Sequence, residues 1–122
     1  MESYKNLTVW KKSVDLVTHI YTLTKLFPKE ELYGLTSQMR RAAVSIPSNI
    51  AEGRSKRSTK EYVRFINIAS GSAAELETQL IIAENLGFTD KEKITSVMNE
   101  LAEVGKMLHG LIASLEKKLT SL

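Results

Sequence analysis

The sequence contains no cysteine, only two prolines and no long apolar run among its 122 residues. The lack of cysteine excludes disulfides, thiolate chemistry and cysteine-ligated zinc. Apolar runs such as residues 80–83 are far too short to cross a bilayer, and the N-terminus shows no signal-peptide pattern. We therefore expect a cytoplasmic protein with no membrane partner, folded as a single domain over residues 1–122.

Motifs that carry chemistry are also missing. The two histidines, His19 and His109, belong to neither a Glu-x-x-His nor an H-E-x-x-H motif of the kinds that bind iron or zinc. The glycines form no GxGxxG or P-loop pattern that would hold a phosphate. The sequence therefore predicts a non-enzymatic protein with no catalytic residue, no metal site and no cofactor.

Four segments have the periodicity of amphipathic helices. Apolar residues recur every three or four positions at about residues 7–27, 32–53, 58–86 and 89–119. No segment alternates polar and apolar residues as a strand would. Four such helices joined by short loops predict an all-α, antiparallel up-down four-helix bundle.

The predicted helix ends follow from capping residues. Side chains of Asn, Ser and Thr accept hydrogen bonds at helix N-termini, and glycine is favoured just past a C-terminus. A Ser or Thr followed three residues later by Glu forms a reciprocal capping box. The predicted caps are Asn6 before the first helix, Gly53 after the second, the pair Ser58 and Glu61 before the third, Gly87 after the third, and the pair Thr89 and Glu92 before the fourth.

Pro47 falls inside the second helical segment. A proline there removes one backbone hydrogen bond and clashes with the carbonyl of Ala43. The segment is either one helix kinked at Pro47 or two helices separated by a break. We favour the kink because the apolar stripe keeps its phase across the proline.

Two helices have more apolar surface than one core needs. The first helix has one row at residues 7, 10, 14, 17, 21 and 24, and a second row at residues 9, 16, 20, 23 and 27. The third helix carries Val63, Ile68, Ile81, Ile82 and Leu86 beside its main stripe. A wider core would bury these residues, but we favour a second interface within a homo-oligomer.

Gly71 and Ser72 interrupt the third helix at mid-length. A glycine inside a helix costs up to about 1 kcal/mol relative to alanine. The favoured interpretation is a close approach between helices that small side chains permit, and the alternative is a ligand-binding notch.

A local excess of positive charge is the feature that points to a ligand. Residues 36–64 hold seven Lys or Arg against two Asp or Glu, whereas residues 65–122 hold five against eight. Basic side chains neutralise phosphates, and a helix N-terminus adds a favourable partial charge. The alternative is a solvated surface, because the interleaved Tyr62 and Phe65 are already explained as core residues. The candidate nucleic-acid-binding residues are Arg40, Arg41, Arg54, Lys56, Arg57, Lys60 and Arg64.

Four stretches resemble a known family, namely residues 4–10 (YKNLTVW), 33–53, 61–65 and 71–80. This is the bacterial four-helix bundle family first noted in open reading frames within intervening sequences of 23S ribosomal RNA genes. The resemblance covers residues 4 to about 88, and it implies a left-handed up-down bundle and a homopentameric ring. A related member is the accessory protein of diversity-generating retroelements, which binds nucleic acid and a reverse transcriptase.

Charge and resemblance together favour one function. We expect a ring-forming, non-enzymatic homopentamer that binds nucleic acid, RNA before DNA, through the basic segment. The alternative is a protein-assembly scaffold that binds a protein partner and no nucleic acid. The sequence does not identify the partner in either case.

Overall fold

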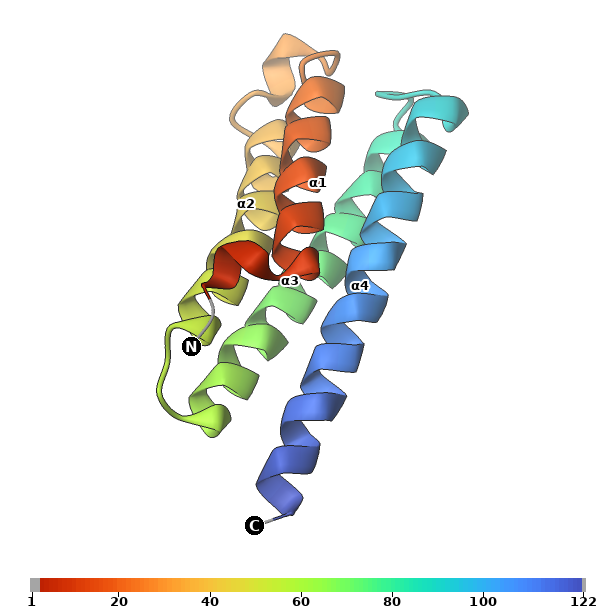
Figure 1. Ribbon diagram of the computed structural model, residues 1–122. Coiled ribbons are helices and arrows are strands. Elements are labelled where there is room, and N and C mark those ends of the chain that lie inside the picture. The colour runs from red at the N-terminus through yellow and green to blue at the C-terminus, as the bar shows by residue number, and fades with distance from the viewer. Residues whose placement is uncertain (1–2, 122) are drawn as a thin grey trace.

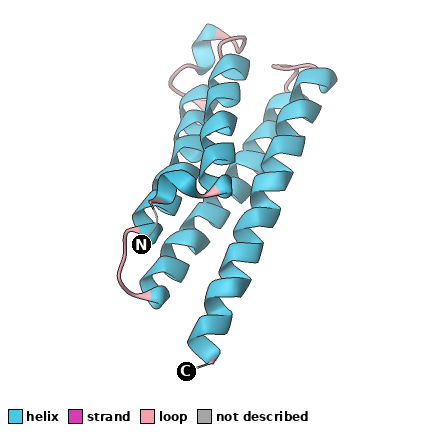
Figure 2. Ribbon diagram, in the orientation of Figure 1, coloured by secondary structure: helices cyan, strands magenta, loops and turns pink. Residues whose placement is uncertain are grey.

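The computed structural model describes residues 3–121, and these residues form helices, turns and loops without a strand (Figures 1 and 2). The helices α1 and α3 each pack against both α2 and α4, so that the four helices enclose one core. The predicted four-helix bundle is thereby confirmed, while its up-down order stays a prediction. Within these residues no helix is long and apolar enough to cross a membrane. The elements are η1 (Tyr4–Asn6), α1 (Thr8–Thr24), η2 (Lys29–Glu31), α2 (Leu35–Arg54), α3 (Thr59–Asn85) and α4 (Lys91–Thr120).

The ends of α3 and the start of α4 follow local chemistry. The Ser58 hydroxyl accepts the Glu61 amide at 3.1 Å, which confirms Ser58 as the N-cap of α3. Gly87 follows α3 with a φ of 76°, a conformation in which glycine has no Cβ penalty. The predicted cap of α4 is wrong by one residue: Asp90 rather than Thr89 is the N-cap, and its carboxylate accepts the Lys93 amide at 2.8 Å.

Three predicted ends of the first two helices need correction. Asn6 closes the short η1 helix, and Leu7 is the N-cap of α1 without a side-chain hydrogen bond. Phe27 lies beyond the end of α1, where its ring packs against Phe88 with centroids 5.6 Å apart. Gly53 is not a C-cap, because α2 continues through Arg54.

Pro47 is buried inside α2, which is helical on both sides of it. This continuity excludes a break at the proline. A bend in the axis at this position stays a prediction.

The second apolar row of α1, and not the first, is the one that is buried in the core. Val9, Leu16, Ile20 and Leu23 are buried in the core, and so is Phe27 after the helix. The other row is largely half-buried, from residue 7 to residue 17, and Tyr21 is exposed. Beside the main stripe of α3, Ile68, Ile81 and Ile82 are exposed, and so is Leu86 just past the helix, whereas Val63 is half-buried against the core. Apolar surface is therefore left on both helices of a single subunit, as a second interface requires.

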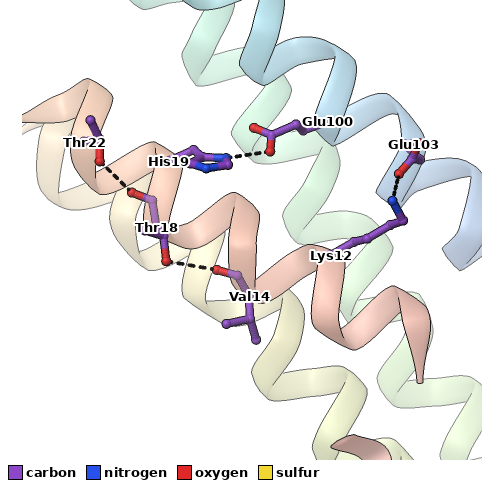
Figure 3. A network of polar contacts seen from close by, with 7 residues as sticks. All are labelled: Lys12, Val14, Thr18, His19, Thr22, Glu100 and Glu103. Atoms are coloured by element: carbon purple, nitrogen blue, oxygen red, sulfur yellow. Dashed lines mark hydrogen bonds and ion pairs between the residues drawn. The ribbon is translucent and has the colours of Figure 1, made fainter. Parts of the chain in front are cut away.

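An ion pair and a hydrogen bond join α1 to α4 on the surface (Figure 3). Lys12 Nζ lies 2.5 Å from Glu103 Oε1, and His19 Nδ1 lies 2.5 Å from Glu100 Oε1. The hydrogen bond with Glu103, followed by its charge, raises the pKa of Lys12. Exposed pairs add little stability, so the buried apolar residues hold the helices together.

Candidate nucleic-acid interface

The seven basic residues chosen from the sequence fall into two separate groups. Arg40 and Arg41 lie near the start of α2, and the other five lie from the last residue of α2 to the second turn of α3. The thirteen residues from Arg41 to Arg54 correspond to about 20 Å of helix. One continuous binding segment in the sequence is thus two surfaces in the fold.

The first group is held against α1. Arg40 Nε donates to the Thr24 hydroxyl at 2.9 Å, and its guanidinium carbon lies 4.5 Å from the centre of the Tyr21 ring. Arg41 is exposed and lines the same surface hollow as Tyr21. Because Tyr21 is the exposed member of the half-buried row of α1, this group borders the surface that we expect to meet another subunit.

The second group gathers where α2 and α3 meet. Phe65 of α3 packs under two cations, with Lys56 Nζ 5.2 Å and the Arg64 guanidinium carbon 4.5 Å from its ring centre. Such cation–π contacts hold both cations against the ring, and each cation also lies beside a carboxylate. Phe65 is only half-buried and lies outside the core cluster, so of the two aromatic residues expected in the core only Tyr62 is there. The five basic residues of this group lie at the same end of the bundle as Lys118 of α4. We call this surface the basic end, and it consists of Arg54, Lys56, Arg57, Lys60, Arg64 and Lys118.

Two carboxylates partly neutralise the positive charge of the basic end. Lys56 Nζ lies 3.3 Å from Glu52 Oε2, and Arg64 donates to both oxygens of Glu61 at 3.0 and 3.2 Å. The hydrogen bonds from Arg64 lower the pKa of Glu61, and Lys56 and Lys60 lower it further. Glu61 thus pairs with Arg64. The predicted capping box would instead have its side chain accept the Ser58 backbone amide. Six cations against these two carboxylates still leave a net positive surface.

Tyr62 joins the basic end to the core. Its ring is buried, and this burial raises the pKa of the phenol, while the charge and hydrogen bond of Arg54 act in the opposite direction. The guanidinium of Arg54 is thereby held beside the phenol at the end of α2. Gly53 permits this arrangement, because a Cβ there would lie 2.9 Å from Phe65 Cβ and 3.1 Å from Tyr62 Cδ1.

A cavity of about 260 Å³ opens at the basic end. Arg54, Lys56 and Arg57 line it from one side, and Lys118 of α4 lines it from another. The sequence prediction missed Lys118 because it is 54 positions after Arg64 in the chain. The predicted topology could nevertheless have identified Lys118, because in an up-down bundle the last turns of the fourth helix lie beside the first turns of the third.

The remaining polar groups suggest no comparable site. The His19–Glu100 pair borders a surface hollow with Thr22, whose hydroxyl donates to the Thr18 carbonyl at 3.1 Å (Figure 3). Over residues 3–121, His, Asp and Glu form no group of three that could hold a metal ion. Gly71 itself is exposed, with open space where a Cβ would be, so the close approach that we expect at this notch does not involve the glycine. The small side chain beside it does permit a close approach of α3 to α2, since Ser72 Oγ lies 2.8 Å from Ser45 Oγ.

Fold and surface define the class as a four-helix bundle that presents cations at one end. Residues 5–110 match the family described as 23S rRNA-intervening sequence protein, and the chain belongs to this family, as the resemblance predicted. Among solved structures, it is similar to a protein of unknown function from the S23 ribosomal protein family of Bacteroides thetaiotaomicron. The two are 27% identical with a TM-score of 0.80, over 86% of this chain and 95% of the other. None of the curated proteins matches the chain.

Proposed function

We propose that the protein is a non-enzymatic, ring-forming homo-oligomer that binds RNA through its basic end. The observation that carries the proposal is the convergence of six cations from α2, the linker, α3 and α4 on one end of the bundle. Phosphate groups are the ligands that such a surface neutralises, with release of counterions from the nucleic acid. The family name, which refers to a ribosomal RNA sequence, makes structured ribosomal RNA the first probe.

The ordered positions of the cations favour a surface that binds a ligand over one that only keeps the protein soluble. Lys56 and Arg64 rest on the Phe65 ring, and Arg54 is held by Tyr62. Side chains that are already ordered lose less conformational entropy when they meet a phosphate. A merely solubilising surface has no need of this ordering.

Oligomerisation would increase the overall affinity, because each basic end alone is a weak binding site. One basic end offers a few phosphate contacts, but a symmetric ring repeats them around one axis. Several basic ends can then engage one polyanion, which increases the overall affinity without any new contact. Tyr21 with the half-buried row of α1, and the exposed apolar residues of α3, are the surfaces that we assign to the contacts between subunits.

The test is filter binding of a ribosomal RNA fragment at two salt concentrations. Changing Arg54, Lys56, Arg57 and Lys60 together to Ala should weaken binding about tenfold or more and flatten its salt dependence. Each lost phosphate contact lowers the slope of log K against log salt by about 0.7 to 0.9. The matched control replaces four cations elsewhere, Lys25, Lys29, Lys91 and Lys93, and carries the same net charge.

The control should bind as the wild type does, since its changed residues lie outside the basic end. Equal losses in the two quadruple variants would show that total charge alone is responsible. Absence of wild-type binding at low salt would favour a protein-assembly scaffold.

A further inference from the structure

The cavity at the basic end combines two kinds of lining. Arg54, Lys56, Arg57 and Lys118 contribute cations, and hydroxyls come from Ser58, Thr59 and Ser114. The apolar part consists of Leu7, Leu111, Leu115 and the ring of Tyr62. No carboxylate lines this cavity within the described residues. A ligand that fits has a strongly anionic group at one end and an apolar body at the other.

The size of the cavity restricts the ligand to about one nucleotide. At about 260 Å³ it lies near the lower limit of ligand pockets, roughly 300 Å³. Four structural parts line this half-open cavity, namely the start of α1, the end of α2 with its linker, the start of α3 and the last turns of α4. A strand end can place its terminal phosphate among the cations while the rest of the strand leaves through the open side.

The charge of the cavity favours a terminal phosphate over an internal one. A phosphomonoester carries close to two negative charges at neutral pH, since its second pKa is about 6, whereas each internal phosphodiester carries one. Cations grouped in a small space therefore distinguish the two by charge as well as by shape. Thr59, the first residue of α3, lines the cavity, and its amide precedes the first intrahelical hydrogen bond, from the Tyr62 amide to the Ser58 carbonyl, so it is a further donor at this end.

We propose that this cavity holds the phosphorylated terminal nucleotide of an RNA strand, with Lys118 as one of its phosphate ligands. The proposal rests on the RNA binding proposed above and adds a preference that general phosphate binding does not predict. The phosphate meets the cations and hydroxyls, while the nucleoside lies against Leu111 and Leu115. Lys118 acts from α4, so the ligand contacts the first turn of α3 and the last turns of α4 together.

The experiment compares one short single-stranded RNA in 5′-phosphorylated and 5′-hydroxyl forms by fluorescence anisotropy at fixed salt. Wild-type protein should bind the phosphorylated form about tenfold more tightly, the usual effect of an added hydrogen bond to a charged group. The preference should decrease below about pH 6, where the terminal phosphate gains a proton. Lys118→Ala should abolish the preference, whereas Lys117→Ala, which removes the same charge next to the cavity-lining residue, should retain it.

Each other outcome has a distinct meaning. Equal binding of the two RNA forms by wild type would overturn this proposal and leave RNA binding intact. Equal loss of preference in Lys118→Ala and Lys117→Ala would overturn the role of Lys118, provided that circular dichroism shows both variants folded. Stronger competition by adenosine monophosphate than by the phosphorylated RNA would assign the cavity to free nucleotides instead of strand ends. Binding of neither RNA would remove the proposed function and this inference together.

Discussion

Gly53 and Phe65 lie so close together that a methyl group at position 53 would come within 2.9 Å of the Phe65 β-carbon. The end of α2 is therefore in direct contact with the start of α3. The same Phe65 ring supports Lys56 and Arg64 on its faces. A packing contact between two helices thus sets the position of two cations of the basic end.

Gly53→Ala should destabilise the protein by about 1–3 kcal/mol, the usual cost of overpacking a buried site. The added Cβ also meets the Tyr62 carbonyl oxygen at 3.2 Å, and backbone cannot rotate away as a flexible side chain can. Urea unfolding followed by circular dichroism measures the change. Gly71→Ala is the matched control, because open space surrounds that position in the helix. The control should stabilise the subunit by about 0.5–1 kcal/mol, and equal effects of the two substitutions would contradict the packing role of Gly53.

The two basic groups should respond differently to substitution. Arg57→Ala should weaken RNA binding and reduce its salt slope by about 0.7 to 0.9, because it removes a phosphate contact at the basic end. Arg41→Ala removes the same charge from an exposed position about 20 Å further back along α2 and should leave the slope unchanged. Filter binding over a salt series distinguishes them. An identical change in slope would mean that the RNA also spans the Arg40 and Arg41 surface.

Ile81→Asp should dissociate the oligomer without unfolding the subunit. Ile81 is an exposed residue on α3, so a carboxylate there costs little in the free chain but is unfavourable in an apolar interface. Light scattering should give about five times 13.7 kDa for wild type and a smaller mass for the variant. Tyr33→Asp changes an exposed side chain outside α1 and α3 and should retain the wild-type mass. A wild-type monomer at micromolar concentration would contradict the assembly proposal.

Asp90 should make the stability of α4 depend on pH at the acid end. The Lys93 amide, followed by the Lys93 side chain, lowers the pKa of Asp90 below its ordinary value. A carboxylate of lowered pKa contributes stability above its ordinary pKa, and the contribution is lost as the pH falls through the folded value. Asn caps a helix as well as Asp does, so Asp90→Asn removes the charge but keeps the cap. The stability difference between wild type and Asp90→Asn, from urea unfolding, should be largest near neutral pH and decrease below about pH 4. Glu92→Gln removes a charge from the same turn without touching the hydrogen bond to Lys93, and an identical pH dependence in this control would argue against the cap.

Several features could be predicted because they depend on residues close together in the chain. The Ser58 cap and Gly87 both act within one turn of a helix end, so local chemistry was sufficient. The exposure of Ile68 and Ile81 beside the α3 stripe followed from helical geometry alone. The cap predicted at Thr89 was wrong by one residue, because the adjacent Asp90 can accept the same kind of hydrogen bond.

The sequence by itself determined four amphipathic helices, their approximate ends and a positive surplus between residues 36 and 64, because periodicity, capping and charge are properties of short stretches. Only the tertiary structure decided which row of α1 is buried, since both rows are apolar and the choice depends on which one faces α2 and α4. Packing also divided the basic residues into two surfaces, because a rigid α2 separates Arg41 from Arg54. It brought Lys118 to the cavity beside Arg54 and Arg57, since helices distant in sequence become neighbours only when they bury a common core.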